Sequence, residues 1–220
     1  MHADTPGSSR APKGGGKRPA AGSPRKKAVE RNKGNPKVTA STALPEFPME
    51  FKFKGHKAVI RPLQPSDRDT LIKFFESHTQ ETIHLRYGYE ITQISEARAA
   101  ELVGVDQTKD AALGIFEQGE AVPLVAIGRY FLRANGKSAE VAFVVREDRR
   151  RMGMATELFY LLLRIAASRG LETVDAQVLR ENQQMLEIFG SLGGVRAAIA
   201  GTGSLNVKIE VRKALRMLGK

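Results

Sequence analysis

The sequence predicts an α/β fold in which helices cover both faces of one central mixed sheet. The first observation is a set of three strand-like runs, over residues 111–116, 122–132 and 139–145, which short turns join into an antiparallel meander. The second is the amphipathic run over 153–169, which leads into a further strand-like run over 173–178. Helices and strands in this order imply a mixed α/β sheet with both faces covered.

A short hairpin and three helices precede the meander. Apolar residues gather over 51–60 around Gly55, and Pro62 ends this hairpin. Ser66 is followed three positions later by an acidic side chain and then by apolar residues at helical spacing, which predicts that Ser66 caps a helix. The expected helices cover residues 66–78, 81–86 and 95–103, with Gly88 and Gly104 as interruptions.

The central helix has one apolar stripe and an identifiable end. Steps of three and four separate its apolar residues, and Gly170 follows as a stop signal. The stripe consists of Met154, Leu158, Leu161, Leu162 and Ile165. A helix over 181–192 and two weaker strands near 195–200 and 205–211 complete the chain.

The composition excludes several kinds of site. The sequence has no cysteine, so disulfides, thiolate zinc sites and cysteine nucleophiles are excluded, and a reducing compartment is expected. No apolar run reaches the roughly 20 residues of a transmembrane helix, and residues 1–10 lack the apolar core of a secretory signal, which predicts a soluble, cytoplasmic protein. His56, His78 and His84 lack the spacing of metal ligands, so we expect surface or capping histidines and no bound metal.

Residues 1–45 differ in composition from the rest of the chain. Up to residue 43 they hold ten basic and two acidic residues and no Leu, Ile, Phe, Tyr or Trp, and they account for most of the formal net charge of +11. Such a segment buries too little apolar area to offset the entropy of ordering it, so we expect a disordered tail before one domain over 46–220. The tail either makes weak, nonspecific contacts with nucleic acid or serves only as a solubilising extension.

Residues 150–155 combine basic and small side chains between a strand and a helix. A strand that turns into a helix start in this way presents free backbone N–H groups and the positive end of the helix dipole. This arrangement suits a pyrophosphate group. The sequence contains neither the three-glycine dinucleotide fingerprint nor the phosphate-loop pattern that ends in Gly-Lys-Ser/Thr.

The pattern Arg150, two residues, Gly153, one residue, Ala155 resembles the acyl-CoA-binding motif of the GNAT N-acetyltransferase superfamily. The resemblance covers residues 139–194 closely and 60–86 more loosely, where the chain resembles the opening of bacterial protein lysine acetyltransferases. It implies the GNAT acyl-CoA N-acyltransferase fold and acetyl-CoA as the co-substrate. The residues that it implies for binding acetyl-CoA are Ala142, Phe143 and Val144 along the pantetheine arm, Arg150, Arg151, Met152, Gly153, Met154 and Ala155 around the pyrophosphate, and Asn182.

Glu140 is the expected catalytic residue. A lysine amine, with a pKa of about 10.4, is almost wholly protonated at neutral pH, so a base within its reach raises the reactive fraction. In the lysine-acetylating branch that the chain resembles, a Glu in an Ala-Glu-Val-Ala-Phe context acts as this base, and Glu140 is the matching position. The alternative is a structural Glu140 that pairs with Lys137 or Arg129 across the hairpin.

Three further assignments stay open. Asn182 either contacts CoA or caps its own helix. Arg86 either guides the acceptor substrate or bridges a helix to a strand. A tyrosine often serves as the general acid in this superfamily, but the chain has Phe189 near that position, so no general acid is assigned.

These residues together predict an enzyme, an N-acetyltransferase that moves an acetyl group from acetyl-CoA to a primary amine. We expect direct attack of the amine on the thioester, since no cysteine exists to form an acyl-enzyme. A protein lysine is the expected acceptor because of the resemblance around Glu140 and Arg86. The alternatives are a small-molecule amine as the acceptor, and a non-catalytic binding module of the same fold with a nucleic-acid-binding tail.

Overall fold

A computed structural model of the chain describes residues 45–87 and 93–219, without the side chains of residues 86 and 87. The expectations of a disordered tail over 1–45 and of its contact with nucleic acid therefore lie, Pro45 apart, outside the described residues. Across the described part of the chain, no helix combines the length and the apolar character that crossing a membrane requires.

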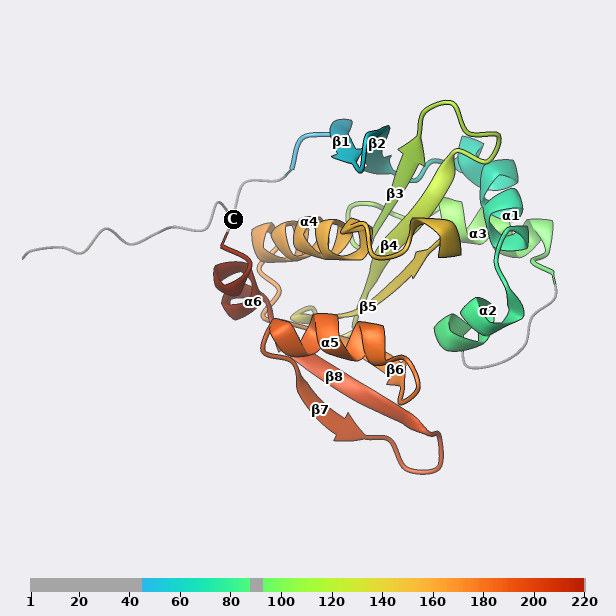
Figure 1. Ribbon diagram of the computed structural model, residues 1–220. Coiled ribbons are helices and arrows are strands. Elements are labelled where there is room, and N and C mark those ends of the chain that lie inside the picture. Colours follow the sequence, from blue (N-terminus) through green and yellow to red (C-terminus); the bar gives the residue numbers. More distant parts are fainter. Residues whose placement is uncertain (1–44, 88–92, 220) are drawn as a thin grey trace, which may run out of the picture. The chain divides into compact units, whose positions relative to one another are not determined.

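The described residues form one mixed sheet of eight strands in the order β1-β2-β3-β4-β5-β6-β8-β7 (Figure 1). Neighbouring strands are antiparallel except for β5 and β6, which are parallel. The strands are β1 (Met49–Phe53), β2 (His56–Pro62), β3 (Ala111–Glu117), β4 (Leu124–Leu132), β5 (Ser138–Val145), β6 (Thr173–Leu179), β7 (Val195–Ala198) and β8 (Ser204–Glu210). The predicted meander is confirmed as β3, β4 and β5.

Helices cover both faces of the sheet, as the sequence predicted. They are α1 (Arg68–Glu76), α2 (Gln80–Tyr87), α3 (Glu96–Val103), α4 (Met154–Ser168), α5 (Gln183–Ser191) and α6 (Val211–Met217), with 3-10 turns η1 (Pro65–Asp67) and η2 (Glu147–Arg149). Helices α1 and α3 share a core with Ala112 of β3 and Ile127 of β4. Helices α4, α5 and α6 pack in a larger core on the opposite face, where Leu113 and Phe143 point.

Helix α4 crosses β3, β4 and β5 and lies against them (Figure 1). The predicted stripe is buried along its whole length, since Met154, Leu158, Leu161, Leu162 and Ile165 are each at most 4% exposed. Gly170 has φ of 76°, a left-handed conformation that glycine adopts without strain and that ends the helix.

One predicted helix cap is wrong, and the sequence analysis missed the last helix. Ser66 does not cap α1, because Pro65 starts a 3-10 turn and the capping carboxylate is that of Asp67, which accepts a 2.8 Å hydrogen bond from the Gln64 N–H. The strand expected over 205–211 ends at Glu210, and the chain continues into α6. Val211, Ala214 and Leu215 recur at helical spacing and are buried, a signal too short to outweigh the preceding strand pattern.

Strands β5 and β6 pair only at their starts. Their parallel ladder joins Ser138 to Thr173, Ala139 to Val174 and Glu140 to Asp175. Beyond Glu140, β6 pairs with β8 alone, so residues 141–145 of β5 have no strand partner on their β6 side within the described chain. The sheet therefore opens between two neighbouring strands in its middle.

Candidate active site

A cleft of about 880 Å³ occupies the place where β5 and β6 separate. Residues 140–143 form one wall and residues 176–179 the other, and Asn182 and Phe189 also line it. The rings of Phe143, Phe159 and Phe189 pack on one another with centroids 5.3–6.3 Å apart and hold α4 and α5 beside the cleft. One side of the cleft is thus a strand edge with backbone groups free to bind an extended ligand.

The loop before α4 presents a run of backbone N–H groups. Across the described chain, the amides of residues 151–156 donate no hydrogen bond to a protein atom, and the first bond of the helix runs from Glu157 N–H to the Gly153 carbonyl. Arg151 and Gly153 have φ of 57° and 82°, and this left-handed geometry turns the loop into the helix start. A hollow of about 1060 Å³ in front of the loop is lined by residues 149–151, 153–156 and, from α5, Gln183 and Gln184.

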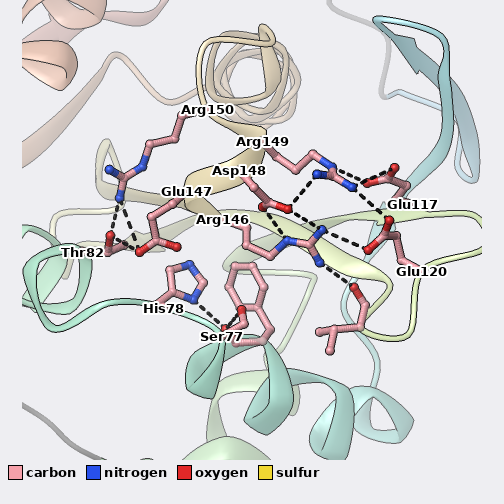
Figure 2. Close-up of polar contacts among 12 residues, drawn as sticks. Ser77, His78, Thr82, Glu117, Glu120, Arg146, Glu147, Asp148, Arg149 and Arg150 are labelled. Carbon is pink, nitrogen blue, oxygen red and sulfur yellow. Dashed lines mark hydrogen bonds and ion pairs between the residues drawn. The ribbon is translucent and has the colours of Figure 1, made fainter.

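The three consecutive arginines of the loop have different surroundings. Arg149 is largely buried and donates hydrogen bonds to Glu117 at 2.7 Å and to Glu120 at 2.9 Å (Figure 2). Arg151 is exposed. Arg150 combines the two kinds of surroundings. It lines the hollow, and its side chain donates a hydrogen bond to the Thr82 hydroxyl of α2.

Glu147 joins α2 to the loop. Its carboxylate accepts hydrogen bonds from the Thr79 N–H at 2.8 Å and from the Thr79 hydroxyl at 2.9 Å. It also accepts a hydrogen bond from the Thr82 hydroxyl and lies 3.9 Å from Arg150 (Figure 2). Burial raises the pKa of the Glu147 carboxyl, but these hydrogen bonds outweigh it and lower the pKa from 4.5 to about 2. The carboxylate is therefore ionised at neutral pH and anchors the start of α2.

Glu140 lies at the mouth of the cleft, on the last pair of the parallel ladder. Its side chain is 47% exposed, and its Oε2 lies 3.4 Å from Nη2 of Arg133. Neither Lys137 nor Arg129, the partners expected for a structural Glu140, takes that place: Lys137 pairs with Glu172 at 3.1 Å. Arg133 holds Asp175 more closely, at 2.6 Å, so it leaves Glu140 only a long contact.

Asn182 takes one of the two roles that the sequence left open, the cap of its own helix, and its contact with CoA stays a prediction. Its side chain accepts a 3.2 Å hydrogen bond from the Met185 N–H and caps α5, and the residue also lines the cleft. Arg86 belongs to α2, but its side chain lies outside the described residues, so its expected role with the substrate stays a prediction.

Two of the histidines agree with the prediction of surface or capping residues: His56 is exposed, and His78 caps α1 through the Phe74 carbonyl. His56 Nδ1 lies 2.5 Å from Oε1 of buried Glu117. His78 lines an apolar pocket beside β5 that the sequence analysis missed. No spacing signal marks this pocket, because its walls come from five elements far apart in the chain. Among the described residues, no group of three or more His, Asp or Glu side chains is arranged to hold a metal ion.

The separated middle strands and the amide-lined start of α4 define the fold of the acyl-CoA-dependent N-acyltransferases. Comparison with known families agrees: a model of the acetyltransferase (GNAT) domain matches residues 57–195, more than half of the chain. The chain belongs to the GNAT acetyltransferase family.

Relatives and solved structures refine this assignment. Acetyltransferase Pat of Mycolicibacterium smegmatis is 28% identical over 142 residues, which are 64% of this chain and 42% of that protein. The chain thus spans less than half the length of this relative. The GNAT domain of S. lividans PAT superposes with a TM-score of 0.67 at 23% identity, over 74% of this chain and 96% of that one. Spermidine N-acetyltransferase of Vibrio cholerae, solved with CoA and spermine, gives a TM-score of 0.57 at 16% identity, over 72% and 98%.

Proposed function

We propose that the protein transfers an acetyl group from acetyl-CoA to a primary amine, and that a lysine side chain of a protein is the acceptor. The observation that carries the proposal is the unpaired edge of β5 lying next to the free amides at the start of α4. These two features fit the two ends of one ligand, because acetyl-CoA has a diphosphate at one end of its pantetheine arm and a thioester at the other.

The residues of the site suit the diphosphate and the pantetheine arm of acetyl-CoA. The amides of residues 151–156 would bind the diphosphate together with the positive end of the α4 dipole. Arg150 and Arg151 would add charge at the same place. The pantetheine amides would pair with the free edge of β5 at Ala142, Phe143 and Val144, as an added strand does. Asn182 would contact the same arm from the other wall of the cleft.

Glu140 would remove the first proton from the amine. Its exposed carboxylate lies where the cleft meets solvent, so an ammonium group can reach it directly or through one water. The neutral amine then attacks the thioester carbonyl carbon. A C–N bond forms and the C–S bond breaks, and the CoA thiolate leaves with a proton. No covalent acyl-enzyme is needed in this sequence of steps.

A lysine acceptor is favoured over a small amine by the sequence relationship. The relative named Pat is 28% identical to this chain over 142 residues, and the stretches around Glu140 and Arg86 resemble protein lysine acetyltransferases. The carbon stem of a lysine is also apolar, which suits the apolar wall that Ile83 and Ile127 form beside β5.

The test is acetyl transfer from radiolabelled acetyl-CoA by the full chain in a bacterial lysate, followed by separation of protein from small molecules. We expect label on lysines of proteins and about 100-fold less in Glu140→Gln. Label on small amines only would make the acceptor a small molecule. If calorimetry detects no binding of acetyl-CoA, the chain is a binding module and the proposal is wrong.

A further inference from the structure

A second pocket lies on the other side of β5 from α4. It is enclosed by α1, α2 and α3 and by β4 and β5, and has a volume of about 480 Å³. Its walls are mostly apolar, with Leu71, Phe74, Ile83 and Ile127 among them. Such a pocket favours a ligand with an apolar body and a few oriented polar groups.

The pocket adjoins the proposed thioester site. Ala142, Phe143 and Val144 line it as well as the spaces on the α5 side of β5. Glu140, Ala142 and Val144 alternate with Val141 and Phe143 along the strand, so their side chains share one face. The mouth of the cleft at Glu140 and the pocket at Ala142 thus lie on the same face of β5, about 7 Å apart along the strand.

His78 lines this pocket, and one of its ring nitrogens has no hydrogen-bond partner among the described residues. Its Nδ1 lies 2.6 Å from the carbonyl oxygen of Phe74, and because a carbonyl only accepts, Nδ1 carries the hydrogen. In the neutral ring the lone pair is then on Nε2. This atom is buried and has no hydrogen-bond partner in the described part of the chain. The Phe74 ring packs edge-on against the imidazole, at 4.5 Å between centroids, and fixes its orientation.

The surroundings keep the His78 ring neutral. Burial lowers its pKa below the usual 6.5, and the cations Arg150 and Arg146 act in the same direction. The Phe74 carbonyl and the Glu147 carboxylate oppose this lowering without cancelling it. Arg129 is a further cation in the wall of the pocket. His78 is therefore an uncharged base at pH 7, with the lone pair of Nε2 in mostly apolar surroundings.

We propose that this pocket holds the acceptor amine during the reaction and that Nε2 of His78 accepts the second proton from its nitrogen. The inference rests on the proposed function and adds a catalytic residue to it. Buried polar atoms without a partner are rare in proteins, and a substrate N–H would supply the missing partner of Nε2.

The proton balance gives such a group a defined role. An ammonium loses two protons when it becomes an amide, one before the attack and one after the C–N bond has formed. Glu140 takes the first and releases it to solvent. His78 takes the second from the cationic nitrogen of the tetrahedral adduct, and this proton goes to the sulfur as the C–S bond breaks. The products are the amide, CoA thiol and one proton in solution.

Two substitutions of His78 separate its two nitrogens. In His78→Asn, the amide nitrogen of the new side chain takes the position of Nδ1 and keeps the bond to the Phe74 carbonyl, but nothing replaces Nε2. In His78→Gln, the end of the side chain reaches the position of Nε2 and can accept a hydrogen bond without titrating. His84→Gln, at an exposed histidine of α2, is the matched control.

The experiment measures acetyl transfer to n-butylamine, which is the lysine side chain beyond its α-carbon, between pH 5 and pH 9. We expect kcat of His78→Asn to fall about 100-fold or more, with the affinity for acetyl-CoA unchanged. His78→Gln should lose kcat but keep KM for the amine. Wild type and His84→Gln should share an extra proton dependence below pH 6.5 that both His78 variants lack.

A measurement on the wild-type protein tests the inference even if the His78 variants do not fold. In the presence of CoA, added n-butylamine should shift the ¹⁵N resonance of His78 Nε2 and leave that of His84 in place. An unmoved Nε2 resonance, or His78 variants with the wild-type rate and pH profile, would overturn this inference alone. A wild-type protein that acetylates no amine would overturn the proposed function and this inference together.

Discussion

Glu140 and Asp175 face each other across the last pair of the ladder between β5 and β6, and Arg133 contacts both carboxylates. The two strands separate immediately beyond this pair. Arg133 therefore places a positive charge between the two carboxylates where the sheet opens. It lies closer to Asp175, whose side chain is 13% exposed, than to the half-exposed Glu140.

Removal of this clamp should destabilise the fold. Arg133→Met leaves the Asp175 carboxylate without its two hydrogen bonds, at 2.6 and 3.1 Å, so we expect a loss of about 1–2 kcal/mol in the free energy of unfolding. Urea unfolding measures it. Lys137→Met breaks the ion pair with Glu172, whose side chains are 68% and 65% exposed, and should change little. Equal losses in the two variants would show that Arg133 has no special role.

The Glu147 carboxylate should make stability depend on pH in acid. Its pKa is about 2 in the folded protein and 4.5 when unperturbed, so the unfolded chain binds the proton first as the pH falls. The stabilisation is complete above pH 4.5, disappears towards pH 2, and is on the order of 2–3 kcal/mol. Unfolding free energies of wild type and Glu147→Gln, measured from pH 6 to pH 2.5, should converge in acid. A constant difference would contradict the assignment.

Gly128 of β4 should tolerate no side chain, since α4 and Phe143 lie directly against it. A Cβ there would sit 2.9 Å from the Phe143 ring and 3.0 Å from the Leu158 Cβ. We expect Gly128→Ala to cost about 1–3 kcal/mol and to weaken acetyl-CoA binding through displacement of Phe143. The smaller side chain of Phe143→Leu should restore part of the stability in the double variant, which thermal unfolding can detect. Additive losses of stability in the double variant would show that the Phe143 ring is not the source of the clash.

Two substitutions in the loop before α4 separate the effect of backbone geometry from the effect of side-chain charge. Gly153 and Arg151 both have positive φ, so Gly153→Ala should strain the loop by about 1 kcal/mol and weaken acetyl-CoA binding at least ten-fold. Arg151→Gly relieves strain and removes only an exposed charge, so its effect on affinity should be smaller and should vanish at high salt. Calorimetric titrations at two salt concentrations make the comparison. The reverse ranking of the two variants would mean that side-chain charge, not backbone geometry, holds the ligand.

The sequence predicted the features that depend on residues close together in the chain. It missed the contacts between residues that lie far apart in the chain. Local patterns predicted the order of β5, the loop and α4. This order puts Glu140 on the strand and Gly153 in the loop. The hydrogen bond from Arg150 to Thr82 joins residues 68 positions apart, which no periodicity reveals. The same holds for the pocket that His78 lines, because its walls come from β4, β5 and three helices. The sequence predicted only a surface or capping histidine at this position.

The most direct test of the account is an NMR titration of the ¹⁵N-labelled protein with CoA and, separately, with pantetheine, which lacks the diphosphate. The account predicts that CoA shifts the amide resonances of residues 151–156, while pantetheine shifts those along β5 and leaves the loop unchanged. Loop resonances that stay in place with CoA, or that move equally with pantetheine, would contradict the claim that these amides bind the diphosphate.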